Sequence, residues 1–374
     1  MWSEPPDASG DESLHFVSGR RRVKLKGHSF REFERRVIPL LDGQNTLEEI
    51  GRNVEDVFAI EDLEAGLDLL ASQNLLEDGP IEEADADAAA RLLPQYNFFQ
   101  EIGLDAAEIQ RQLRRATVTV LGLSGAGANL VDALAASGVG TIRCVDGSIV
   151  SPADIYLSSG FCTTDVGSTR ISVTERRVSG RSPETKLETL SSDLSSDEAV
   201  TDTIEGSDFV VCCLDLGQSS LIYKLNRACL KTDTRWTSCT LSGSEVIVGP
   251  TIHPRVTPCY LCYKMRVVAC AGNPEDAFAF EKVLDRRKQD DSSNRENLVF
   301  GAGLAANMLA LETLREVAGL TPVPTLGKLV IFDLLDMSSS KHVVLRKPWC
   351  PACFPMGSKS AAVPDELSHQ SKPR

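Results

Sequence analysis

The sequence predicts an α/β protein in which a small, winged-helix-like α+β module precedes a larger, doubly wound sheet. Residues 14–76 combine two stretches of alternating apolar and polar residues with three helical patterns. From residue 112, buried strand patterns alternate with helical ones, which is typical of a sheet with right-handed crossovers. A chain of 374 residues is expected to form two or three domains.

Charge and hydropathy exclude two kinds of partner. The formal net charge of 39 − 53 = −14 argues against nucleic acid, because phosphate binding requires a basic surface. No apolar run approaches the roughly 18 residues of a membrane span, and Met1–Asp7 does not resemble a signal peptide. We therefore expect a cytoplasmic protein that contacts neither nucleic acid nor membrane.

Composition shifts predict the domain boundaries. Both chain ends are polar and contain proline, and residues 77–91 form an acidic, alanine-rich stretch between two apolar regions. The expected parts are a disordered tail at 1–12, the N-terminal module at 13–78, a linker with a helix at 79–111, the sheet domain at 112–354 and a disordered tail at 355–374.

The N-terminal module is expected to contain two strands and three helices. Leu14–Val17 and Arg22–Lys26 alternate apolar and polar residues, as half-buried strands do. Ser29 is expected to cap the first helix, and Thr46–Glu49 has the sequence of a capping box that opens the second. The third helix carries three leucines on one face, namely Leu63, Leu67 and Leu70.

Five further segments have strand patterns in addition to the first buried strand, Thr117–Leu121. An alanine- and leucine-rich helix is expected at Ala126–Ser137. The strands that follow are predicted at Gly140–Asp146, Asp208–Asp215, Glu245–Val248, Leu329–Asp333 and His342–Arg346. The last two are expected to form an antiparallel pair.

A glycine-rich turn, Gly122–Gly127, separates the first buried strand from the following helix. Gly122, Gly125 and Gly127 would allow backbone amides to approach a phosphate at the helix N-terminus. Asp146 follows the next strand, where an acid can bind ribose hydroxyls. Ser124 occupies the position of the middle glycine of the dinucleotide fingerprint. Two interpretations stay open, a nucleotide-binding turn and a tight turn that only packs the helix against the sheet.

Four of the eleven cysteines form two Cys-x-x-Cys pairs. Cys259, Cys262, Cys350 and Cys353 can supply four thiolates to one tetrahedral ion, which is typical of structural zinc. Redox chemistry is the alternative, but neither pair has a thioredoxin-like context. The five histidines show no paired spacing. No residue is therefore assigned a catalytic role, and a structural zinc ion is the expected cofactor.

With these motifs placed, residues 112–354 resemble the E1-like superfamily of ThiF, MoeB and the ubiquitin-activating enzymes. The most specific matches are Val256-Thr-Pro-Cys-Tyr-Leu-Cys262 and Lys347-Pro-Trp-Cys-Pro-Ala-Cys353. The resemblance implies a Rossmann-like sheet with a zinc site, and ATP-dependent adenylation of a peptide C-terminus. It assigns Asp146 to the ribose, Asp215 to the metal and phosphates, and Arg170 to the place of the family's lysine.

The segment Ala153–Ser158 departs from the family's adenylation motif. Asp154 stands where the family has asparagine, and Leu157 stands where it has an arginine that stabilises the transferring phosphates. Loss of such an arginine can cost several orders of magnitude in rate. The departures argue against adenylation and leave ATP binding open.

This pattern resembles one branch of the superfamily, the E1-like partner proteins of YcaO cyclodehydratases in azoline-forming peptide pathways. The N-terminal module resembles the PqqD-like precursor-recognition domain, which binds a leader peptide by strand addition. That resemblance implies a leader site formed by Val23, Lys24 and Leu25 together with the three leucines of the third helix. It also implies three partners: a precursor leader peptide, a YcaO enzyme and a second copy of the chain.

Three functions follow from these resemblances. The first is a leader-binding partner that presents a precursor to a YcaO enzyme. The second is an E1-like adenylyltransferase with a peptide clamp, similar to the microcin C maturation enzyme. The third is a zinc-stabilised dimer scaffold whose glycine-rich turn is purely structural. The substitutions at Ser124, Asp154 and Leu157 favour the first over the second.

Overall fold

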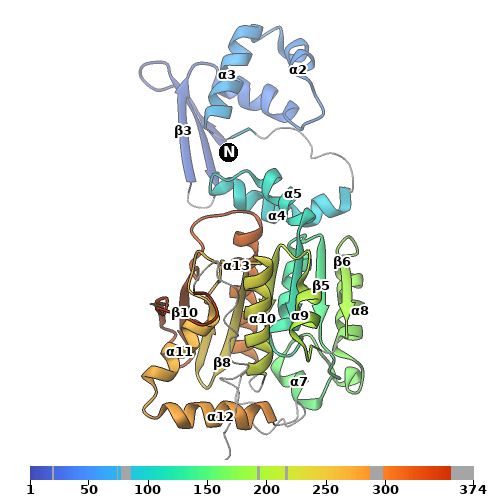
Figure 1. Cartoon of the computed structure of the whole chain (residues 1–374). Helices are drawn as coiled ribbons and strands as arrows, with labels where there is room; N and C mark the ends of the chain where they lie inside the picture. Colours follow the sequence, from blue (N-terminus) through green and yellow to red (C-terminus); the bar gives the residue numbers. More distant parts are fainter. Residues whose placement is uncertain are drawn as a thin grey trace, which may run out of the picture. The chain divides into compact units, whose positions relative to one another are not determined.

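The computed structural model describes residues 1–18, 21–73, 75–76, 86–191, 194–214, 218–286 and 298–354 (Figure 1). The chain divides between Gln110 and Arg111 into two compact units. None of the described helices is long and apolar enough to cross a membrane. The predicted tail at 355–374 lies outside the described residues.

The first unit contains a three-stranded antiparallel sheet with the strand order β1-β2-β3. Its strands are β1 (Trp2–Glu4), β2 (Glu12–Ser18) and β3 (Arg21–Gly27). The helical elements that follow are α1 (Phe30–Glu32), the π-helix η1 (Phe33–Val37), the 3₁₀-helix η2 (Ile38–Leu40), α2 (Leu47–Val54) and α3 (Ile60–Ser72). Apolar residues of the sheet and of these helices pack into one core.

The predicted capping box is confirmed, whereas the predicted first helix is not regular. The backbone N–H of Thr46 donates to Glu49 at 2.8 Å, and Thr46 Oγ1 accepts from the Glu49 N–H at 3.3 Å. Ser29 adopts a left-handed conformation with φ 63° and makes no side-chain cap. The chain then passes from one α turn into π and 3₁₀ turns, because Pro39 has no N–H to continue an α-helical ladder.

The expected disordered tail at 1–12 is corrected by strand β1. Trp2 pairs with His15 and Glu4 pairs with Ser13 on β2. The Trp2 ring stacks on the His15 ring, with centroids 4.8 Å apart. Composition alone misjudged this segment because its order comes from cross-strand contacts rather than from a run of apolar residues.

The segment predicted as a linker with a helix at 79–111 is largely helical where it is described. It contains α4 (Ala86–Glu101) and most of α5 (Ala106–Arg115). The Gln95 amide donates to Gln110 at 2.8 Å. The boundary between the two units falls inside α5.

The second unit is built on an eight-stranded mixed sheet with the order β11-β10-β9-β8-β7-β4-β5-β6. The parallel part consists of β4 (Thr117–Leu121), β5 (Thr141–Val145), β6 (Lys186–Leu190), β7 (Phe209–Cys212) and β8 (Trp236–Ser242). The antiparallel part consists of β9 (Glu245–Val248), β10 (Lys328–Asp333) and β11 (Ser339–Val343).

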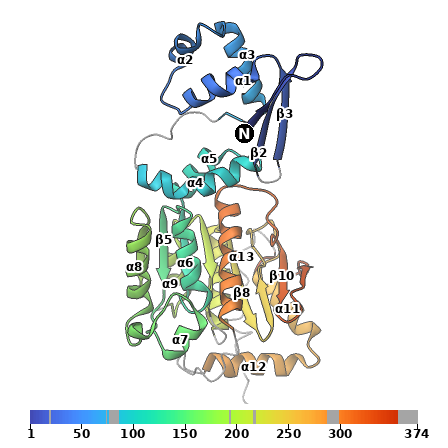
Figure 2. The same ribbon diagram turned by 180° about the vertical axis from the view of Figure 1, so that it is seen from behind.

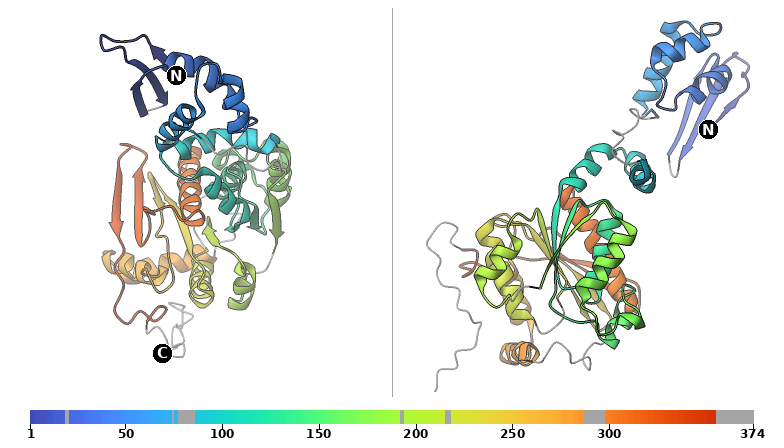
Figure 3. Two further views of the ribbon diagram at one scale, coloured as in Figure 1. Left: turned by 90° about the horizontal axis from the view of Figure 1, so that it is seen from above. Right: turned by 90° about the vertical axis from the view of Figure 1, so that its right-hand side faces the viewer.

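Helices cover both faces of this sheet, as a doubly wound fold requires (Figures 2 and 3). One face carries α6 (Ala126–Ala136), α8 (Arg170–Arg181) and α13 (Val299–Val317), and the other carries α9 (Asp197–Ile204) and α10 (Ser219–Thr232). The remaining helices of the described part are α7 (Pro152–Leu157), η3 (Thr163–Asp165), α11 (Tyr260–Cys270) and α12 (Pro274–Arg286).

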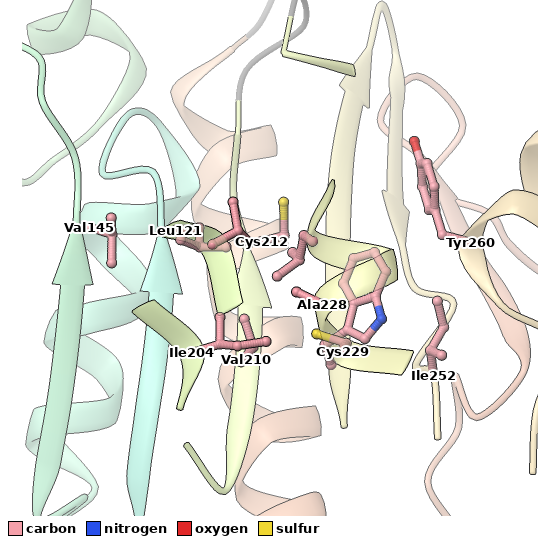
Figure 4. Packing of buried hydrophobic residues seen from close by; sticks show 12 residues of the cluster. Leu121, Val145, Ile204, Val210, Cys212, Ala228, Cys229, Ile252 and Tyr260 are labelled. Carbon is pink, nitrogen blue, oxygen red and sulfur yellow. The ribbon is translucent and has the colours of Figure 1, made fainter. Parts of the chain in front are cut away.

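One hydrophobic core of this unit lies between the sheet and the α9–α10 layer (Figure 4). Trp236, from β8, belongs to it and is fully buried. Leu121 and Val210 contribute from neighbouring strands, and Ile204 and Cys229 contribute from the helices. Each buried large side chain contributes about 1.5–3 kcal/mol to stability.

The predicted strands from Thr117 onward are present, and β6 and β8 were not predicted. Strand β8 contains Thr237, Ser238 and Thr240, so it lacks the Val/Ile/Leu run expected of a central strand. Strand β6 lies at the sheet edge and is nowhere fully buried. The last strand begins three residues earlier than predicted, at Ser339, and pairs antiparallel with β10 as expected.

Candidate functional site

The glycine-rich turn joins β4 to α6 in a conformation that requires glycine. A Cβ at Gly127 would lie 1.9 Å from the Gly122 carbonyl oxygen, so the helix packs directly on the turn. Gly125 has φ 49° and precedes the first residue of α6. The nearest atoms to a Cβ at Gly125 would belong to Ala302 and Leu157. Residues 121–128 are all buried, so the protein itself covers the turn.

Asp146 follows β5 and is hydrogen-bonded within the protein. Its Oδ2 accepts from the Leu123 backbone N–H at 2.7 Å, and its Oδ1 accepts from the Ser148 N–H at 2.7 Å. Its side chain is 5% exposed, and Arg170 Nη1 lies 3.4 Å from Oδ2. The position predicted for the ribose acid therefore already ties the turn to the end of β5.

Asp154 and Arg170 form a buried ion pair beside this turn. Arg170 Nη2 donates to the two carboxylate oxygens of Asp154 at 2.8 and 3.0 Å. The two side chains are 0% and 6% exposed. Burial by itself would raise the pKa of Asp154, but the Arg170 charge and hydrogen bonds from Ser151 hold that pKa below its ordinary value.

Local sequence places both partners of this pair. Asp154 lies in the first turn of α7 and accepts from the Ser151 N–H at 2.8 Å, which completes a capping box. Arg170 is the first residue of α8, and Thr169 caps that helix through the Ser172 N–H. A cation at a helix N-terminus is unfavourable by itself. Asp146 and Asp154 offset that cost.

The charges around the turn disfavour a phosphate group. The Arg170 guanidinium is already matched by two carboxylates, and a phosphate placed there would face both. Leu157 is buried and adds no charge at the position implied for an arginine. Ser124 Oγ lies 3.4 Å from Asp154 Oδ1. Asp215 lies outside the described residues, so its predicted role near a metal stays a prediction.

Sequence reasoning noted the replacements at 154 and 170 separately and did not predict their ion pair. The sequence did contain a signal for this ion pair. The position of a neutral asparagine holds an acid, and the position of a lysine holds an arginine, which can bind a carboxylate through two parallel hydrogen bonds. Such complementary changes indicate contact.

The two Cys-x-x-Cys pairs converge into one buried cluster that could hold a metal ion. The four sulfur atoms lie within 4.8 Å of one another. Three of the Sγ–Sγ distances are 3.9, 3.8 and 3.6 Å. A tetrahedral zinc with Zn–S bonds of about 2.3 Å requires sulfur atoms about 3.8 Å apart. A disulfide would need about 2.05 Å, so the spacing suits an ion and excludes a bridge.

The four thiols act on one another's pKa in opposite directions. Hydrogen bonds within the cluster lower the pKa of Cys262 and lower that of Cys350 to about 7, and they raise the pKa of Cys259 and Cys353. The Lys347 N–H lies 3.4 Å from Cys262 Sγ. Cys259 precedes α11, and Cys350 follows β11, so an ion here would join the end of the sheet to that helix.

In the first unit, β3 lies at an edge of the sheet formed by the described strands. Its other side pairs with β2 from Arg21 to Gly27. In an antiparallel pair alternate residues direct their N–H and C=O away from the partner, so β3 presents such groups along its outer edge. The chain's own N-terminal strand does not cover this edge, because β1 pairs on the opposite side of β2.

The side chains predicted to bind a leader peptide differ in burial. Leu63 and Leu70 are 0% and 2% exposed and belong to the core of the first unit. Leu67 is half-buried at the margin of that core, together with Val23 of β3. Lys24 is exposed, and Leu25 is buried. Of the three leucines, only Leu67 has surface left for a ligand.

The fold and the site together define an E1-like α/β protein with a four-cysteine cluster. The sequence matches the ThiF family over residues 92–352. The chain belongs to the ThiF family.

Relatives and solved structures agree with this assignment. The chain is 26% identical over 288 residues to the sulfur carrier protein adenylyltransferase of Thermus thermophilus, covering 73% of this chain and 91% of that protein. It is 27% identical over 247 residues to the heterocyst HesA protein of Trichormus variabilis, covering 65% and 82%. The fold is similar to that of Escherichia coli MccB crystallised with ATP, with a TM-score of 0.64, 17% identity, and coverage of 93% and 96%. It is also similar to that of PaaA, with a TM-score of 0.64, 19% identity, and coverage of 79% and 96%.

Proposed function

We propose that this chain captures the leader of a precursor peptide on the β3 edge and presents the precursor to a YcaO cyclodehydratase supplied by another chain. The edge of β3 that no other described strand pairs with is the observation that carries the proposal. Main-chain pairing along an edge gives affinity for an extended peptide with little demand on its sequence. In this proposal the first unit is a PqqD-like recognition domain, and Val23, Lys24, Leu25 and Leu67 contact the leader.

The ThiF-family unit then acts as a scaffold. The YcaO enzyme uses ATP to activate a backbone amide, and a Cys, Ser or Thr side chain closes an azoline ring. This chain would raise the effective concentration of the precursor at that enzyme. The buried Asp154–Arg170 pair supports a role without adenylation. Phosphates would need a cation beside the turn, but the charge of Arg170 is already neutralised by Asp154. In the same proposal, a zinc ion stabilises the ThiF-family unit of each chain, and two chains form a homodimer.

A second function is favoured by one specific observation. The likeness to MccB covers more than nine-tenths of this chain, including the first unit. One of these structures contains MccB with N-formylated MccA. The alternative is therefore an ATP-dependent adenylyltransferase that acts on a peptide C-terminus, with the first unit as its clamp.

We expect no ATP–pyrophosphate exchange by the purified chain, with or without a candidate Cys-, Ser- or Thr-rich precursor peptide. The covered glycine-rich turn and the uncharged Leu157 leave the phosphates without ligands. Mixed with a YcaO cyclodehydratase, the same chain should promote loss of one water per ring from that peptide, measured by mass spectrometry. Peptide-dependent exchange without a YcaO enzyme would establish the adenylyltransferase instead.

A further inference from the structure

Strand β3 is strongly basic within an acidic protein. Four of its seven residues are Arg or Lys, although the whole chain has a formal net charge of −14. Arg22, Lys24 and Lys26 occupy alternate positions and are all exposed. Because alternate residues of a strand point to the same face, these three form a row of cations on the outer face of the sheet.

The opposite face of the same strand is apolar. Val23 and Leu25 alternate with the cations and pack with Phe16 and Leu14 of β2 in the core of the unit. A peptide strand added beside β3 would have its own alternating faces, in register with these. One set of its side chains would lie next to the cations and the other next to the apolar margin at Val23 and Leu67.

Carboxylates already approach two of these cations from the other side. Glu4 Oε2 lies 3.0 Å from Lys24 Nζ, and Asp7 Oδ2 lies 3.5 Å from Lys26 Nζ. All four side chains are well exposed, so these are weak surface pairs that solvent screens. The hydrogen bond from Lys24 is the main cause of a lowered pKa of Glu4. Carboxylates are thus favourable neighbours for this row.

From this arrangement we infer that the β3 edge selects an extended peptide segment in which acidic and apolar residues alternate. The inference rests on the leader-capture function proposed above and specifies the chemistry of the leader. Directly opposed residues on neighbouring strands lie about 4.5–5.5 Å apart, which is within reach of a Glu or Asp paired with Lys or Arg. A leader strand with acids at every second position would place them beside Arg22, Lys24 and Lys26 while its apolar residues face the core.

The test is a titration of the full chain with labelled synthetic peptides. One peptide contains the central stretch Glu-Leu-Glu-Val-Glu, and its matched counterpart contains Gln-Leu-Gln-Val-Gln. Each exposed ion pair changes affinity by about two- to fivefold, so three pairs predict about ten- to hundredfold tighter binding of the acidic peptide. The difference should shrink in 1 M salt, where the screening length falls to about 3 Å.

Variants locate the effect on the strand. The double variant Lys24→Glu/Lys26→Glu should remove most of the preference, whereas Lys24→Arg should keep it. Lys341→Glu, an exposed lysine on strand β11 of the other unit, is the matched control and should leave both peptides unaffected. Circular dichroism confirms that each variant is folded, which is expected because the altered side chains are exposed.

Three outcomes would overturn the inference. If the acidic and the Gln peptide bind with equal affinity and Val23→Pro abolishes the binding of both, peptide capture on β3 is supported. The selection of acidic residues is then contradicted. Binding of neither peptide would contradict the selection of acidic residues, and failure of candidate Cys-, Ser- or Thr-rich precursors to bind as well would contradict leader capture. Displacement of the acidic peptide by an equal charge concentration of single-stranded oligonucleotide would reassign the cation row to phosphate.

Discussion

Replacing Cys350 by Ser is expected to abolish zinc binding and leave the ThiF-family unit largely unfolded. A four-thiolate zinc site contributes on the order of 10 kcal/mol to folding. That is comparable to the whole net stability of a typical domain, about 5–15 kcal/mol. The four sulfurs come from two chain segments 91 residues apart, so the ion would fix a contact between distant parts of the sequence.

Metal analysis of the purified chain should give one zinc per chain, and chelation should lower its melting temperature. Cys144→Ala is the matched control, because Cys144 is equally buried but lies on β5, outside the cluster. It should retain zinc and lose only a small part of the stability. A native chain without metal, whose four thiols react freely with a thiol reagent, would contradict the site.

Replacing Arg170 by Met is expected to destabilise the ThiF-family unit by about 3–5 kcal/mol. The change leaves the carboxylate of Asp154, which is 0% exposed, without its cation, and removal of one partner of a buried pair has a cost of this size. Asp154→Asn combined with Arg170→Met should recover part of the loss, since position 154 then carries no buried charge, although Asp146 still lacks its contact with Arg170. Denaturant unfolding of the single and double variants gives the coupling energy.

The pH dependence provides an independent check on the same pair. Because Arg170 holds the pKa of Asp154 below its value in the unfolded chain, the stabilisation is fully present above that unfolded value, about 3.9. It should be lost as the pH falls through the lower folded value, and this component should be absent in the double variant. Purely additive losses in the single and double variants would show that the two residues are not coupled.

The sequence was informative where one kind of physical signal dominates. Strand β4 was predicted with its observed bounds because every residue after Thr117 is buried and apolar or β-branched. The cysteine spacing predicted convergence of two distant segments because few other structures require such pairs. Strand β8 was missed because Thr237 and Ser238 are buried polar residues whose place is set by neighbouring strands.

The position of the candidate site could be predicted from the sequence, but the burial of its glycine-rich turn could not. The turn lies between β4 and α6 as expected, and Asp146 follows β5. Coverage of the turn by Leu157 and Ala302 depends on packing of α7 and α13, which no local pattern encodes. Likewise, Leu63, Leu67 and Leu70 follow one helical spacing and lie on one face of the helix. That spacing could not show which of them is buried in the core and which can face a ligand.

Amide hydrogen exchange over residues 21–27 of the full chain tests the proposed capture of a leader most directly. The measurement compares the chain alone with the chain saturated by a candidate Cys-, Ser- or Thr-rich precursor peptide. Strand addition predicts new protection of alternate β3 amides, because those N–H groups gain a partner, and unchanged exchange on β11, an edge strand of the eight-stranded sheet. New protection at the glycine-rich turn of residues 122–127 with none on β3 would contradict the account.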